Sequence, residues 1–164
     1  MNMLEFNLKS NRTALEVFFS ALNVLRDQKI LINNKDFTCQ IGEWLVEMLY
    51  DGKRATSGIQ KGWDVEAQGK HFQVKTHAKA ETNSAKFSAV EKESAEQIDE
   101  LIIIVFTFDY KLKEFYKVPW SYAYPNIKLR GKKNPRYEIN WSSIKHYKIA
   151  LESLPHQEVV NLFR

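Results

Sequence analysis

Asp64, Gln73 and Lys75 place an acid, an amide and an amine at a spacing that allows them to share one site. The carboxylate of Asp64 is the hard, anionic oxygen ligand that Mg²⁺ favours, and the amide oxygen of Gln73 is a neutral second ligand. The backbone carbonyl of Val74 would be a third. A cation held there, Mg²⁺ or Mn²⁺ in its place, lowers the pKa of bound water and stabilises charge on a phosphate, while Lys75 orients that water or offsets the phosphate charge. These residue types predict metal-dependent phosphodiester hydrolysis.

A predicted hairpin positions these side chains. Gln68–Gly69 separates two alternating segments, and a two-residue turn with Gly in second place is a hairpin signal. This turn sets a register in which Asp64 lies opposite Gln73, with their Cβ atoms about 5 Å apart and Lys75 within diagonal reach. Because side chains alternate between faces, two faces are predicted. The apolar face carries Trp63, Val65, Phe72 and Val74, and the polar face carries Asp64, Glu66, His71, Gln73 and Lys75.

Hydrophobic periodicity along the chain predicts an α/β fold in which helices flank a mixed sheet. One helix is expected over Thr13–Ile30 with Asn11 as its N-cap, and a second over Cys39–Tyr50, ended by Asp51–Gly52. A loop and a helix are expected within 78–98, an irregular aromatic region over 119–125 and a basic loop after it. The expected strands are 54–57, 63–67, 70–77, 101–108, 114–118 and 137–140, and a last helix is expected over 157–163.

The motif resembles the core motif of the PD-(D/E)XK nuclease superfamily, which includes restriction endonucleases. Asp64 is followed by Gln73-Val74-Lys75, and the order of elements from 39 to 108 matches the family core of helix, three strands, helix and strand. The family often places a glutamate on the first helix, and Glu43 occupies that position. The resemblance implies a single restriction-endonuclease-like domain over residues 1–164. It also implies a DNA endonuclease in which the metal is held by Asp64, Gln73, Val74 and Glu43. Lys75 would position or activate the nucleophilic water.

Two positions depart from the family pattern. Trp63 replaces the proline of the motif, and Gln73 replaces the usual acid. Gln-x-Lys is compatible with activity, since restriction enzymes resembling the methyl-directed type use it. The change removes one negative charge, so metal affinity should fall or depend more on Glu43. It also motivates an alternative, a DNA-binding module that keeps the nuclease fold without turnover.

Several basic residues outside the motif are candidates for contacts with DNA phosphates. Those near the motif could equally belong to an ordinary strand and loop, and the basic stretch from 128 to 136 could equally be a solvated loop. The aromatic side chains at 120, 122 and 124 could stack on bases, although core packing is the favoured interpretation. The candidate DNA-binding residues are Lys61, His77, Lys79, Lys128, Arg130, Lys132, Lys133 and Arg136.

Composition limits the remaining possibilities. The 164 residues carry a formal net charge of +4, which weakly favours a polyanionic partner. The longest apolar stretch, 101–106, is too short to cross a membrane, and a single cysteine, Cys39, excludes an internal disulfide. A cytoplasmic protein that acts on double-stranded DNA as a homodimer, as in a type II restriction endonuclease, is the favoured prediction. A junction resolvase, a repair nuclease and an interaction protein unrelated to nucleic acid stay open.

Overall fold

The computed structural model describes residues 3–33, 36–55, 62–79, 86–92 and 97–164. The chain divides into two compact units, Met1–Ile41 and Gly42–Arg164. Each unit is considered by itself, and the prediction of one domain over the whole chain stays a prediction. In the part of the chain that the structure describes, no helix is long and apolar enough to cross a membrane.

The first unit contains α1 (Met3–Asp27). Asn11 therefore lies inside α1, and the prediction that it caps the helix is wrong; the residues before it are mostly good helix formers and extend the helix backwards. The helix ends where Lys29 adopts a left-handed conformation with φ 57°. There the N–H of Ile30 donates to the carbonyl of Leu25 at 2.9 Å, which is the hydrogen bond of a Schellman C-cap.

The second unit is built on a six-stranded sheet with the order β1-β2-β3-β5-β6-β9. Strands β3 and β5 run parallel, and the other neighbours are antiparallel. This confirms the predicted α/β class with a mixed sheet. The strands are β1 (Lys53–Arg54), β2 (Val65–Ala67), β3 (Lys70–Lys79), β5 (Glu100–Thr107), β6 (Leu112–Pro119) and β9 (Lys148–Ile149).

A second sheet has three strands in the order β4-β8-β7. This sheet and the helix beside it correct three predictions. The segment 78–98 contains a strand, β4 (Phe87–Ala89), and no α-helix among its described residues. The basic stretch is not a loop throughout, since β7 (Lys128–Arg130) and β8 (Arg136–Asn140) pair as a hairpin. The aromatic region forms α3 (Trp120–Asn126). Pairing of β4 with β8 joins segments about fifty residues apart, so local patterns do not reveal it.

Helical segments complete the second unit. Helix α2 (Phe37–Leu49) continues into this unit from Gly42, and it ends before Asp51–Gly52 as predicted. The predicted C-terminal helix is present as α4 (Gln157–Val160) followed by a 3₁₀ turn. The 3₁₀ segments are η2 (Trp141–Tyr147), η3 (Leu151–Ser153) and η4 (Asn161–Phe163).

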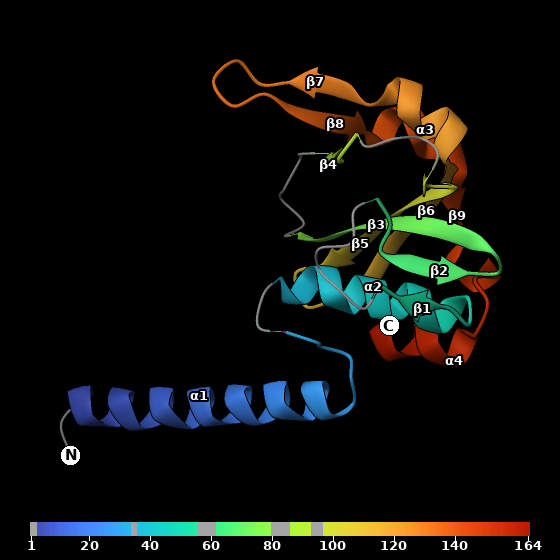
Figure 1. Ribbon diagram of the computed structural model, residues 1–164. Coiled ribbons are helices and arrows are strands. Elements are labelled where there is room, and N and C mark those ends of the chain that lie inside the picture. The colour runs from blue at the N-terminus through green and yellow to red at the C-terminus, as the bar shows by residue number, and fades with distance from the viewer. Residues whose placement is uncertain (1–2, 34–35, 56–61, 80–85, 93–96) are drawn as a thin grey trace. The chain divides into compact units, whose positions relative to one another are not determined.

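The two faces of the main sheet are covered by different elements (Figure 1). The second sheet and α3 lie on one side, while α2 and α4 lie on the other. Strand β5 is buried along most of its length, as expected for an apolar strand between two layers. On the side of the second sheet, the core consists of Val90, Ile98, Leu101, Ile103, Val105, Tyr116, Val118, Trp120, Ala123, Ile127, Ile139, Trp141 and Ile144.

Helix α2 approaches the sheet most closely at Gly42. A Cβ atom built on this glycine would lie 1.8 Å from Oγ1 and 2.8 Å from Cβ of Thr76 on β3. Farther along, Tyr50 packs on Phe72 with ring centroids 5.4 Å apart. Because side chains alternate along β3, Thr76 and Phe72 face α2, whereas Lys75 faces the second sheet.

Replacement of Gly42 by alanine is expected to destabilise the protein by about 1–3 kcal/mol through overpacking against Thr76. In a helix interior without such a contact, the same change stabilises by roughly 0.5–1 kcal/mol. Urea unfolding followed by circular dichroism would measure the difference. Thr76→Ala in the Gly42→Ala background should restore part of the lost stability; equal stability of G42A and wild type would contradict the predicted packing.

Candidate active site

Asp64 lies immediately before β2 and is fixed to β3 on both sides of Gln73. The predicted register is confirmed for Val65 with Phe72 and for the two pairs that follow it. At Asp64 the backbone N–H donates to the carbonyl of Phe72 at 2.8 Å, and Oδ2 accepts the N–H of Val74 at 2.7 Å. The second carboxylate oxygen, Oδ1, is then the one that can turn toward a cation.

Gln73 is the buried polar member of the group. Its side chain is only 4% exposed, and its Oε1 has no hydrogen-bond partner among the described residues. A buried amide oxygen normally accepts a hydrogen bond, so the Gln73 oxygen is open to a water molecule or a cation; Oγ1 of Thr76 and Oε2 of Glu100 also have no hydrogen-bond partner among the described residues. Gln73 shares its face of β3 with Lys75, and an amide oxygen is a ligand that Mg²⁺ accepts.

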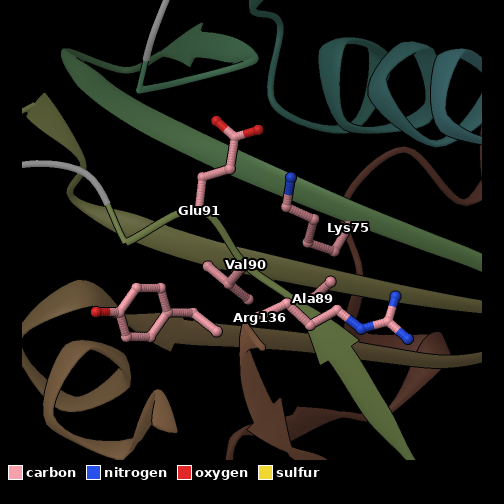
Figure 2. Close-up of a pocket in the computed structure, with 6 residues that line it drawn as sticks. Lys75, Ala89, Val90, Glu91 and Arg136 are labelled. Carbon is pink, nitrogen blue, oxygen red and sulfur yellow. The ribbon is translucent and has the colours of Figure 1, made fainter. Parts of the chain in front are cut away.

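Lys75 is half-buried and lines a cavity of about 370 Å³ between β3 and the second sheet. The other lining residues come from β4, the residues that follow it and β8, namely Ala89, Val90, Glu91, Arg136 and Tyr137. In Figure 2 the Lys75 amine and the Glu91 carboxylate extend toward the same side of this cavity, and the Arg136 guanidinium extends toward another. The cavity thus has cationic and anionic groups around an apolar floor.

The electrostatics of the site centre on Asp64. Burial raises the pKa of its carboxyl above the ordinary value, and the nearby charge of Glu91 adds to the increase. The positive charge of Lys75 and the hydrogen bond from Val74 act in the opposite direction. A carboxylate whose desolvation is only partly offset gains from a cation, because the cation supplies the missing positive charge.

Glu91 was not identified from the sequence. It lies two residues beyond β4, in a polar segment for which the sequence predicts only a loop and a helix. Nothing in its local sequence distinguishes it from other charged residues there. It reaches the cavity because β4 pairs with β8 and brings the following residues beside Lys75.

The predicted metal ligands are brought together only in part. Asp64 lies beside Gln73 at the point where β2 begins, whereas the contribution of Val74 that the structure shows is its N–H to Asp64. Glu43 is half-buried on α2, the helix that packs against the face of β3 opposite Lys75. Among the described residues, no three His, Cys, Asp or Glu side chains are grouped as a metal site. A cation would therefore use one carboxylate, one amide and non-protein oxygens, a set that suits Mg²⁺.

The alternation of polar and apolar side chains predicted for the hairpin is present in the structure, except at Trp63. Strand β2 begins at Val65, so the alternation does not extend back to Trp63. Instead its indole stacks on the imidazole of His71, with ring centroids 4.7 Å apart and planes at 8°. Trp63 is half-buried and lies at the edge of the hairpin rather than in the apolar face.

His77 takes part in a polar network inside the second unit. Its Nε2 lies 2.7 Å from Oγ of Ser88 on β4, and that oxygen also accepts a hydrogen bond from Nε1 of Trp141 at 2.8 Å. Ser88 is fully buried, so the network ties β3, β4 and η2 together. This gives His77 a structural role, and its predicted contact with DNA stays a prediction.

The basic residues of the β7–β8 hairpin are all exposed. Arg136 also lines the cavity and forms an ion pair with Glu138 at 2.9 Å, while the guanidinium of Arg130 lies 4.6 Å from the centre of the Phe87 ring. Lys61 lies outside the described residues, and for Lys79 only the backbone of β3 is described. The exposed residues are Lys128, Arg130, Lys132, Lys133 and Arg136.

In comparisons with known proteins, no family model matches the sequence, and a search of curated proteins gives no match either.

Asp64→Asn is expected to stabilise the metal-free protein at neutral pH. The new asparagine side chain would keep an oxygen for the Val74 N–H while removing a charge whose burial is unfavourable. Because the folded-state pKa of Asp64 is raised, the wild-type residue opposes folding above that pKa and ceases to do so as the pH falls through it. The stability gain should therefore shrink in acid.

Urea midpoints of wild type and D64N, measured with a chelator at neutral and acidic pH, test this expectation. A variant that is less stable than wild type at neutral pH, or a gain that grows in acid, would contradict it. Glu66→Gln provides the control, since it removes an exposed acid from β2.

Proposed function

We propose that this protein is a Mg²⁺-dependent DNA endonuclease that hydrolyses phosphodiester bonds. The observation that carries the proposal is the buried, unpartnered Oε1 of Gln73, which lies between the two attachments of Asp64 to β3 and on the same face as Lys75. This set provides oxygens of the kind that Mg²⁺ binds, together with the amine of Lys75, which lines the cavity. Mn²⁺ is expected to substitute for Mg²⁺.

The residues divide the chemistry among them. Asp64 and Gln73 would hold the cation, and the Val74 N–H keeps the Asp64 carboxylate in place. When bound, the cation would acidify a water molecule and offset charge on the phosphate. Lys75 orients the attacking water and stabilises the negative charge that develops on the phosphate oxygens. Arg136, which borders the same cavity, is placed to hold a neighbouring phosphate.

The order of elements supports membership of the PD-(D/E)XK superfamily and a restriction-endonuclease-like fold. Helix α2, strands β1 to β3 and strand β5 follow the family order, with the motif residues at β2 and β3. One difference concerns the helix expected between β3 and β5, because the described part of that segment contains β4 instead. The small second sheet is then an addition to the core that the resemblance implies.

Double-stranded DNA is the proposed substrate, and the exposed β7–β8 hairpin is its proposed contact surface. Five basic side chains on this hairpin would neutralise backbone phosphates. We further propose a homodimer of the type II restriction kind, because cutting both strands requires two sites. A junction resolvase or a repair nuclease would use the same chemistry. A reducing cytoplasm is proposed as the compartment, since a chain with a single cysteine, Cys39, has no internal disulfide to maintain.

A DNA-binding module without turnover is the second candidate function. The observation that favours it is the neutral amide of Gln73 at the position where the family usually has an acid, which leaves Asp64 as the only acidic member of the Asp64, Gln73 and Lys75 motif. Such a module would retain DNA through the basic hairpin. It would need no cation, so metal binding separates it from the enzyme.

Plasmid DNA incubated with Mg²⁺ or Mn²⁺ is expected to be cut by the wild type. Asp64→Ala and Lys75→Ala should each slow cleavage by about 10²-fold or more, the usual loss for such groups. Lys113→Ala is the matched control, because Lys113 is an exposed lysine of β6 that is not among the cavity residues. Gel electrophoresis measures the rate, and discrete fragments would indicate a restriction enzyme.

An inert wild type at every metal concentration would refute the enzymatic proposal. Retention of DNA by that inert protein would favour the binding module. Equal cleavage by wild type, D64A and K75A would refute the assignment of the residues while leaving the activity to another site.

Lys132→Ala with Lys133→Ala is expected to weaken DNA binding and to reduce its dependence on salt. Each lost contact with a B-DNA phosphate should lower the slope of log Kobs against log salt by about 0.9. Fluorescence anisotropy with a labelled duplex at several salt concentrations measures the slope. The control removes two exposed lysines elsewhere, Lys111 and Lys113. Equal losses in both double variants would show that the hairpin is not the contact surface.

A further inference from the structure

Glu91 is the acidic residue that lines the cavity beside Lys75. It follows β4, and its carboxylate extends toward the same side of the cavity as the Lys75 amine (Figure 2). Its charge also acts on Asp64, which places the two carboxylates within electrostatic range of each other. Glu91 itself is exposed, so its carboxylate is accessible to solvent and solutes.

The proposed cation site has fewer negative charges than the family pattern, and the carboxylate of Glu91 could supply another. Divalent cations bind more tightly when more of their oxygen partners are anionic. Of the two side chains proposed as ligands, only Asp64 offers a charge to the cation, because Gln73 is neutral. Repulsion between two carboxylates near Lys75 is unfavourable without a cation and becomes favourable attraction when a cation lies between them.

The other acids nearby are less well placed. Glu43 belongs to α2, which packs against the Thr76 face of β3, opposite the face that carries Lys75. Glu66 is exposed on β2 and lines a separate cavity of about 220 Å³ at the turn of the hairpin, with Lys53 and Gly69. Among the described residues, Glu91 is the acid that lines the cavity together with Lys75.

We propose that Glu91 supplies the second carboxylate of the cation site, in place of the acid that Gln73 lacks. This inference rests on the proposed metal-dependent function and adds a residue to it. The second sheet then has a function in the site, since the segment after β4 brings Glu91 to the cavity and β8 contributes Arg136 to its lining. The cation would be held between the hairpin and the second sheet rather than by the hairpin alone.

Binding of Mg²⁺ and Mn²⁺ to the intact protein, measured by isothermal titration calorimetry without DNA, tests the proposal independently of activity. Glu91→Gln should weaken cation affinity about tenfold or more, which is the lower end of the loss when a carboxylate supporting a metal site is removed. Glu91→Asp keeps the charge and should recover part of the affinity. Glu66→Gln and Glu43→Gln remove the same charge elsewhere, and the Mg²⁺ dependence of plasmid cleavage is recorded for all variants.

Each outcome decides the proposal. Weaker binding in E91Q, partial recovery in E91D and unchanged binding in E66Q support it, provided that the urea midpoint of E91Q equals that of the wild type. Unchanged affinity in E91Q, together with lost affinity in D64N, overturns the role of Glu91 and leaves the proposed nuclease intact. Lost affinity in E43Q with unchanged affinity in E91Q assigns the second carboxylate to α2. A wild type that binds neither cation overturns both proposals.

Discussion

The hydrogen bond from the Val74 N–H to Asp64 Oδ2, 2.7 Å long, is the constraint on which the site depends. It holds a carboxylate against the backbone of β3 at the point where β2 begins, and it does so from the residue next to Gln73. Burying a carboxylate is unfavourable, and one hydrogen bond with one nearby lysine offsets the desolvation only partly, so the pKa of Asp64 is raised. The negative charge of Asp64 is therefore only partly compensated, and a bound cation would compensate it further.

A more deeply buried carboxylate, on β5 of the main sheet, is paired with protein cations. Glu100 on β5 is 8% exposed and lies between two lysine ammonium groups, 2.5 Å from Nζ of Lys70 and 3.2 Å from Nζ of Lys117. The two lysine ammonium groups balance the charge of Glu100, although its Oε2 has no hydrogen-bond partner among the described residues. Asp64 lacks such a pair, and this contrast separates a structural acid from a candidate ligand.

The two faces of the main sheet have different roles. One face packs against α2, and the other carries the candidate site residues. Gly42 allows α2 to lie close against Thr76. Because side chains alternate along β3, the neighbouring Lys75 then faces the second sheet. On that face, the fully buried hydroxyl of Ser88 receives the Trp141 indole N–H and contacts His77, so β4 is held beside β3 by polar bonds as well as by apolar packing. These contacts hold β4 next to β3, and the cavity lies between β4 and Lys75.

The sequence alone determined the parts of the protein that depend on local chemistry. The Gln68–Gly69 turn and the alternation around it predicted the register of Val65 with Phe72, because two-residue turns leave little freedom in pairing. The continuous apolar run predicted β5 as a central strand, and Asp51–Gly52 predicted the end of α2. Asp64, Gln73 and Lys75 were therefore correctly placed near one another.

Only the tertiary structure decided what surrounds those residues. Pairing of β4 with β8 and the position of Glu91 follow from contacts between segments about fifty residues apart, and such contacts leave no periodic signal in either segment. The displacement of Trp63 onto His71 depends on where β2 begins, which packing sets rather than propensity. The orphaned oxygen of Gln73 depends on burial by both layers, so it could be recognised only once the layers were assembled.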